Sequence, residues 1–175
     1  TGVQTCALPI LIPAEAVARA PADGYTLLVF GNTFWLVPFL QQVPYDPVKD
    51  YSPVTLAVSS PYVMVVHPSL PAHSVKDLIA LARTRPGQLN YGGALPGSLT
   101  ELAAELFKSM ARISIVRINY KGTGSTLNAI MSGDIQLIIT PSGPVMPHVR
   151  SGRLRALAVT SAKPSALLPG LPTVA

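Results

Sequence analysis

Two patterns of hydrophobic residues alternate along the second half of this chain. Short runs of β-branched and aliphatic residues fill residues 115–118, 135–140 and 154–160. Between them, apolar residues recur every three or four positions, as in residues 126–131. Strands and helices that alternate in this way predict an α/β domain built on a parallel sheet. With a first strand at residues 89–92, we expect four strands and three helical crossovers.

Two further helices are predicted from their caps and apolar stripes. Ser74 is placed to cap a helix that ends before Pro86 and Gly87. Ser98 and Glu101 have the spacing of a capping box, in which each side chain bonds the other residue's backbone N–H. The helix that follows has apolar residues at helical spacing, and we expect them to form one buried face: Leu99, Leu102, Ala103, Leu106, Phe107 and Met110.

The first third of the chain has a weaker pattern. The β-forming residues 25–30 predict a strand, and a polar loop and a short helix at 34–41 follow it. Two more strands are expected at 54–58 and 62–67. The aromatic residues Phe34, Trp35 and Phe39 are expected to pack in a core, and lining a cleft for an organic ligand is the alternative.

Three loops follow the predicted parallel strands, at residues 92–97, 119–125 and 140–144. Right-handed crossovers bring such loops to the same edge of a sheet, where ligands bind in α/β folds. Together with the first polar loop, this edge supplies the candidate ligand-binding residues: Asn32, Thr33, Gly93, Gly97, Ser98, Tyr120, Lys121, Gly122, Thr123, Thr140, Pro141 and Ser142.

The chemistry of these loops favours binding over catalysis. The loop at residues 121–125, KGTGS, lacks both the P-loop ending and the third glycine of a dinucleotide fingerprint. Two interpretations of this loop remain. It is either a plain strand-to-helix turn or a site where backbone N–H groups hold a small anion. None of the eight acids lies in the three loops, the histidines lack metal-ligand spacing, and no G-x-S-x-G elbow is present. We therefore expect no cofactor, no metal and no enzyme activity.

Composition narrows the choice of partner. The net charge is +5, with the basic residues scattered along the chain. Nucleic-acid binding needs such residues gathered on one face, whereas a mild positive field suits small anions. No apolar run approaches the roughly 18 residues that suggest a membrane span, so direct membrane insertion is not expected.

Several blocks of the chain resemble one family. They are ADGYTLLV, VPYDPVKDYSPVTL, HPSLPAHSVKDLIALARTRPGQLNYG, GSLTELAAELFKSMA, NYKGTGSTLNAIMSGDIQ and GRLRALAVTSAKPSALLPGLPTVA. In order and spacing they are similar to the solute-binding receptors of tripartite tricarboxylate transporters, the Bug family. The resemblance implies a type II periplasmic-binding-protein-like fold, with two α/β lobes that close on a ligand like a hinge.

The same resemblance implies a function. The receptor would capture a small carboxylate in the periplasm, such as a di- or tricarboxylate, an acidic amino acid or an aromatic acid. It would deliver this ligand to the membrane components of the transporter. Two alternatives stay open: an α/β enzyme fragment acting on a small organic acid, or the ligand-sensing lobe of a regulator.

The resemblance also predicts the domain organisation. Residues 1–10 contain VQTCALPI, which is similar to a translated sequencing adaptor, and we expect this segment to be non-native. Residues 11–62 would form a partial first lobe. Residues 63–175 would form the second lobe and the start of the return crossing. Family members are longer at both ends, so we expect apolar faces in the first lobe to be exposed.

Overall fold

The computed structural model describes residues 8–93 and 98–174, and it divides the chain into two compact units. Unit 1 contains the chain up to Ala57 together with Ser98 and Leu99, and unit 2 contains the remaining described residues from Val58 onwards. Each unit is described below by itself. The predicted lobe boundary after residue 62 and the predicted non-native segment at residues 1–10 stay predictions, and residues 1–7 lie outside the described part.

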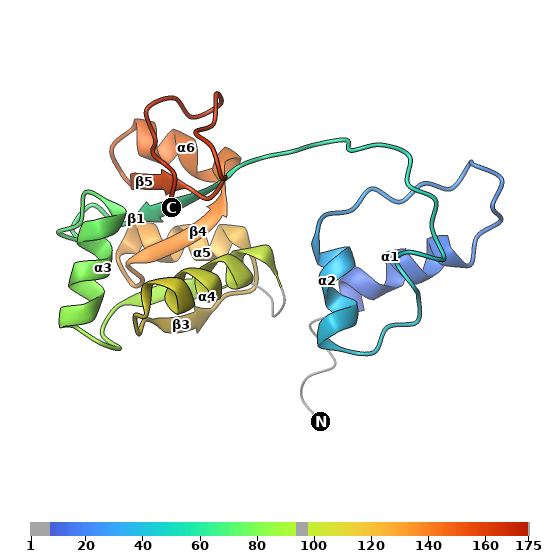
Figure 1. Ribbon diagram of the computed structural model, residues 1–175, viewed down its shortest axis with the longest axis horizontal. Coiled ribbons are helices and arrows are strands. Elements are labelled where there is room, and N and C mark those ends of the chain that lie inside the picture. The colour runs from blue at the N-terminus through green and yellow to red at the C-terminus, as the bar shows by residue number, and fades with distance from the viewer. Residues whose placement is uncertain (1–7, 94–97, 175) are drawn as a thin grey trace. The chain divides into compact units, whose positions relative to one another are not determined.

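Unit 2 is built on a five-stranded sheet with the order β3-β2-β4-β1-β5 (Figure 1). The strands are β1 (Tyr62–Val66), β2 (Asn90–Gly93), β3 (Val116–Asn119), β4 (Leu137–Pro141) and β5 (Arg155–Val159). The four predicted crossover strands are present, but the sheet is mixed. Strand β1 lies between β4 and β5 and is antiparallel to both, whereas β2 is parallel to β3 and β4.

The four crossover strands run in one direction as predicted, and β1 alone makes the sheet mixed. This strand precedes the crossover series in the chain and starts at the edge where β4 ends, since Tyr62 pairs with Pro141. A strand that enters from that edge must run against its neighbours. The insertion of β1 separates β4 from β5, which are consecutive in sequence.

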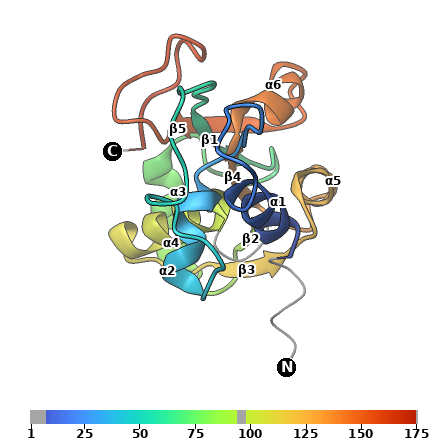
Figure 2. The ribbon, with the colours of Figure 1, turned by 90° about the vertical axis from the view of Figure 1, so that its right-hand side faces the viewer.

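Helices cover both faces of this sheet (Figures 1 and 2). They are α3 (Val75–Thr84), α4 (Leu99–Ala111), α5 (Thr123–Ser132) and α6 (Ser142–Arg150). Met64 and Val66 of β1 pack in a core with α3 and α4, while Val63 and Val65 pack with α5 and α6. Successive strand residues point to opposite faces, so a sheet buried on both faces needs continuous apolar strands. For this reason the continuous apolar run at residues 135–140 predicted a strand that is covered on both faces.

The predicted buried face of α4 is rotated in the structure. Ala104, Phe107 and Ala111 face the core, whereas Leu106 and Met110 are 61% and 72% exposed. The core beside α4 already contains Tyr91 and Leu137, so the small Ala104 and Ala111 allow the helix to pack close to the sheet. Helical spacing alone does not distinguish this face from the neighbouring, more hydrophobic one.

The predicted helix ends agree well with the structure elsewhere. The Ser74 side chain accepts a 3.1 Å hydrogen bond from the Asp77 N–H, as an N-cap does. Helix α5 ends at Gly133, which adopts the left-handed conformation with φ of 84°. None of the helices in the described residues is both long and apolar enough to cross a membrane.

Unit 1 contains two helices, α1 (Leu8–Ala18) and α2 (Thr33–Leu40), around a small aromatic core. The Phe34 ring stacks on Tyr45 with centroids 5.1 Å apart, and it meets Tyr51 edge-on at 4.8 Å. The Tyr51 hydroxyl donates to the Ala14 carbonyl at 2.6 Å. Core packing was expected for Phe34, Trp35 and Phe39, but Trp35 is 47% and Phe39 86% exposed.

The predicted strands at residues 25–30 and 54–58 are not strands in the structure, which has no strand within residues 8–57. Their alternating apolar residues are exposed: Tyr25, Leu27 and Val29 by 68–91%, and Val54, Leu56 and Val58 by 79–82%. A segment forms a β-strand only where the backbone of a neighbouring segment pairs with it. The exposed apolar faces expected for this part of the chain are confirmed.

A buried tyrosine makes the stability of unit 2 sensitive to alkaline pH. Tyr91 is 1% exposed, and its hydroxyl donates a 2.5 Å hydrogen bond to Glu105. Burial, and then the Glu105 carboxylate, raise the pKa of Tyr91 above its ordinary value. A raised folded-state pKa contributes stability that is fully present below the unfolded pKa of about 10 and is lost at higher pH.

We therefore expect Tyr91→Phe to cost about 1 kcal/mol of unfolding free energy at pH 7, because it removes one hydrogen bond. The deficit should shrink as pH rises above about 10, because only the wild type carries the Tyr91 proton. Urea denaturation between pH 7 and 11 measures the difference. Tyr25→Phe is the control, since Tyr25 is 91% exposed. A deficit that stays constant across this pH range would contradict the account.

Candidate functional site at the carboxyl edge of the sheet

Three strands of unit 2 end at the same edge of the sheet, and three helices begin there. Gly93 of β2 pairs with Asn119 of β3, and β4, parallel to β2, ends at Pro141. The Tyr120 N–H donates to the Gly93 carbonyl at 2.9 Å and extends this pairing by one residue. Helices α4, α5 and α6 follow these three strand ends. The three predicted loops meet at this edge of the sheet, which we call the rim, apart from residues 94–97, which lie outside the described part.

The starts of α5 and α6 leave backbone donors at this rim. Their N-cap positions are Gly122 and Pro141, and no side chain in the described residues caps either helix. The N–H groups of the first turn have no partner within a helix and carry its positive dipole end. At α6, the Ser142 N–H donates to the Pro61 carbonyl at 3.2 Å. The first turn of α5 therefore presents the larger set of donors to a ligand.

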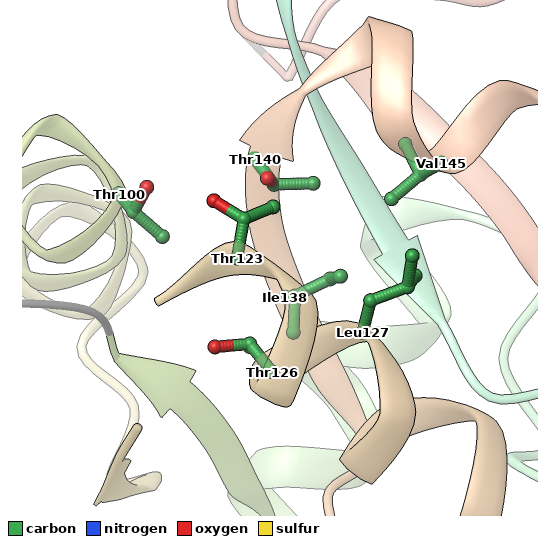
Figure 3. Close-up of a pocket in the computed structure, with 7 residues that line it drawn as sticks. All are labelled: Thr100, Thr123, Thr126, Leu127, Ile138, Thr140 and Val145. Atoms are coloured by element: carbon green, nitrogen blue, oxygen red, sulfur yellow. The ribbon is translucent and has the colours of Figure 1, made fainter. Parts of the chain in front are cut away.

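A small hollow, which we call the threonine pocket, lies behind these helix starts (Figure 3). Helices α4, α5 and α6 and strand β4 supply its walls, and the lining residues are Thr100, Thr123, Thr126, Leu127, Ile138, Thr140 and Val145. In Figure 3 the hydroxyls of Thr100, Thr123 and Thr140 lie around one space, with the apolar side chains beyond them. The volume is about 10 Å³, close to the least that holds one water. The pocket is therefore too small to enclose an organic ligand.

The buried polar residues of the described chain are concentrated at this place. Thr126, Thr140 and Ser142 are 5%, 4% and 8% exposed, and they are the only polar or charged residues classed as buried in the described part. The Thr126 hydroxyl donates to the Gly122 carbonyl at 3.0 Å, and the Ser142 hydroxyl lies 3.5 Å from that of Ser60. Burying hydroxyls costs free energy unless they find partners, and two of these three have a partner within the described chain.

The charges around the rim leave it neutral to positive. Glu101, in the first turn of α4, forms an ion pair with Arg117 of β3, and both side chains are mostly buried. This arginine offsets the only acid in the first turns of the three helices. Lys121 lies on the rim and is exposed. The described residues contain no group of three His, Cys, Asp or Glu side chains that could hold a metal ion.

The structure separates the predicted site residues. Asn32 and Thr33 lie at the start of α2 in unit 1, and Ser98 directly precedes α4. Gly97 lies outside the described residues. The others lie at the rim of unit 2: Gly93, Tyr120, Lys121, Gly122, Thr123, Thr140, Pro141 and Ser142.

Sequence reasoning missed Thr100 and Thr126. They lie within the first turns of α4 and α5 and line the threonine pocket. Their position in the helix after a rim loop is the signal that could have found them.

A sheet covered by helices on both faces, with polar loops at its carboxyl edge, is typical of the lobes of small-molecule receptors. Over residues 6–175 the chain matches the model of the tripartite tricarboxylate transporter family receptors. The chain belongs to this family. The family is one of transport receptors, so the prediction that the chain is not an enzyme is confirmed.

Curated relatives support the assignment. The chain is 34% identical over 168 residues to protein BugT of Bordetella pertussis, and the match covers 94% of this chain and 52% of BugT. It is 34% identical over 165 residues to a UPF0065 protein of Bordetella bronchiseptica, covering 93% of this chain and 49% of that protein. The chain thus spans about half the length of the curated relatives it matches.

Solved structures show the same fold. The chain superposes on R. palustris Rpa4515, solved with adipate, with a TM-score of 0.83 and 38% identity, covering 93% of this chain and 55% of Rpa4515. The periplasmic binding protein BugD gives a TM-score of 0.81 at 27% identity, with 93% and 55% covered. The predicted periplasmic-binding-protein-like α/β fold is confirmed by these similarities.

Proposed function

We propose that the protein captures a small carboxylate in the periplasm and delivers it to the membrane components of a tripartite tricarboxylate transporter. The rim of unit 2 would form one wall of the ligand site. Its residues Tyr120, Lys121, Gly122, Thr123, Thr140 and Ser142 would contact the ligand, together with Thr100 above the threonine pocket. Asn32 and Thr33 of unit 1 are proposed as further ligand contacts.

The observation that carries the proposal is the clustering of threonine hydroxyls beside uncapped helix starts. A carboxylate oxygen accepts several hydrogen bonds, and the first-turn N–H groups of α5 and the hydroxyls of Thr123 and Thr140 are donors. The positive ends of the helix dipoles favour a negative ligand. The Glu101–Arg117 ion pair removes the charge that would otherwise repel it.

Transport and location rest on the family. The relatives include proteins described as periplasmic binding proteins, and the family name describes a receptor of a transporter. Rpa4515 was solved with adipate, a six-carbon dicarboxylate, and it is 38% identical to this chain. These facts support a carboxylate as the ligand and the transporter as the partner.

Ligand-induced stabilisation tests the proposal. A ligand at ten times its dissociation constant stabilises the folded state by about 1.4 kcal/mol, which raises Tm by about 3–6 °C for a chain of this size. We expect such a rise with at least one member of a panel of dicarboxylates, tricarboxylates and aromatic acids. Millimolar concentrations are appropriate, because relatives twice as long would offer further contacts.

The matched controls are the neutral amides of the same acids at equal ionic strength. They keep the carbon skeleton and remove the charge. A rise with the acid and none with its amide is the expected result. No rise with any acid at concentrations up to tens of millimolar, or equal rises with acid and amide, would count against the proposed function.

A further inference from the structure

A second hollow in unit 2 adjoins the rim. We call it the serine groove. It lies between residues 59–62, which lead into β1, and residues 160–167, which follow β5. Its volume is about 400 Å³, much more than the threonine pocket offers. Backbone pairing fixes its base: the Thr160 N–H donates to the Tyr62 carbonyl at 3.0 Å, and β1 pairs with β5 at Val63 and Val159.

The lining of the serine groove suits an acidic group. Five serine and threonine side chains and one lysine line it: Ser59, Ser60, Thr160, Ser161, Ser165 and Lys163. None of the described side chains that line it is acidic. Lys163 forms no ion pair within the described part of the chain, so its ammonium group has no carboxylate there to neutralise it. A carboxylate would find both charge and hydroxyl donors in this groove.

The same groove also offers apolar surface. Pro61, Pro164 and Leu167 contribute to its walls, beside the ring of Tyr62. Methylene groups lose contact with water against such side chains, which favours binding of a carbon chain. The groove thus suits an organic acid better than an inorganic anion, which has no apolar part.

Two residues connect the serine groove to the rim beside the threonine pocket. Tyr62 lines the groove and pairs with Pro141, which follows Thr140 of the threonine pocket in β4. Ser60 lines the groove, and its Oγ lies 3.5 Å from the Oγ of Ser142 at the start of α6. The serine groove therefore adjoins the start of α6.

We propose that the ligand is an extended dicarboxylate, with one carboxylate at the α5 and α6 helix starts and the second in the serine groove beside Lys163. This inference rests on the proposed function and makes Lys163 a specificity-determining residue. A monocarboxylate of the same length would fill the rim and leave Lys163 unpaired. The receptor would therefore prefer the dicarboxylate through contacts made in the groove.

Amide chemical shifts of the 175-residue chain test this with two probes, adipate and hexanoate. Both have six carbons, and hexanoate lacks the second carboxylate. We expect adipate to shift the amides of residues 122–126 and also of 160–165, and hexanoate to shift only the first group. Lys163→Met should remove the response at 160–165 and weaken adipate binding about tenfold, the effect of one charge-assisted hydrogen bond. Lys163→Arg should retain much of the preference for adipate.

Lys76→Met is the matched control, because Lys76 is an exposed lysine in the first turn of α3 and does not line the groove. It should bind adipate as the wild type does. The inference is overturned if both probes shift residues 160–165 equally, if adipate leaves them unchanged, or if Lys163→Met and Lys76→Met behave alike. If neither probe shifts any amide, the proposed function fails and this inference falls with it.

Discussion

Gly92→Ala is expected to lower the unfolding free energy of unit 2 by about 3 kcal/mol. A Cβ at this position would lie 2.3 Å from Cγ2 of Thr126 and 2.6 Å from Cδ1 of Ile135. Both side chains are buried and β-branched, so they have few alternative rotamers and little space to move. The added methyl would force β2 away from α5. Thr126 also lines the threonine pocket, so the same substitution would distort the proposed site.

Gly124→Ala is the matched control for this prediction. Gly124 lies within α5, and a Cβ there would meet nothing within 4 Å. Alanine favours a helix over glycine, so we expect unchanged stability or a gain of up to about 1 kcal/mol. Urea denaturation of both variants measures the contrast. Equal midpoints for Gly92→Ala and the wild type would show that the packing around β2 is looser than described.

Thr140→Val is expected to weaken carboxylate binding about tenfold or more while leaving the fold intact. Valine matches threonine in shape, and Thr140 is 4% exposed at the end of β4. The substitution removes one hydroxyl from the threonine pocket, and a hydrogen bond to a charged group contributes about 1.5–3 kcal/mol. The urea midpoint should change by the equivalent of less than about 1 kcal/mol, because valine also suits a buried strand. Affinity for adipate, followed by amide shifts, is the measurement.

Thr84→Val provides the comparison. Thr84 lies in the last turn of α3, where its side chain is exposed, and it does not line the threonine pocket. Its hydroxyl donates to the Leu81 carbonyl at 2.9 Å. This variant should bind as the wild type does. If Thr140→Val also binds normally, the buried hydroxyls of the rim have a structural role only, and the proposed contacts at Thr140 must be abandoned.

The elements of unit 2 were predictable from the sequence because their signals are local. The run at residues 135–140 is apolar throughout, and β4 is indeed covered on both faces. Ser74 and Gly133 set helix ends through their own side chain or backbone conformation. The position of β1 was not predictable in this way, because strand order depends on contacts between segments far apart in the chain. An apolar strand fits equally well at several places in a sheet.

Unit 1 shows the opposite case. Residues 25–30 and 54–58 have strand-forming sequences, but the described part of the chain supplies no partner for them. Propensity for a strand becomes structure only when hydrogen bonds to a neighbour form. Pairing with a further strand would cover Tyr25, Leu27 and Val29.

The candidate site was predictable at the level of loops and only partly at the level of side chains. Parallel strands bring their carboxyl ends together, so residues 119–125 and 140–144 could be assigned to one rim. Whether the side chains of Thr100 and Thr126 point into the pocket depends on which faces α4 and α5 turn towards the sheet. The rotation of α4 differed from the predicted one, and so its contribution to the pocket was missed.

A crystal structure of this chain grown with adipate tests the central claim most directly. The account predicts a carboxylate at the rim of unit 2, with its oxygens about 3 Å from first-turn N–H groups of α5 and from the Thr140 hydroxyl. Adipate bound elsewhere in unit 2, or a rim without adipate at concentrations that saturate binding in solution, would contradict it.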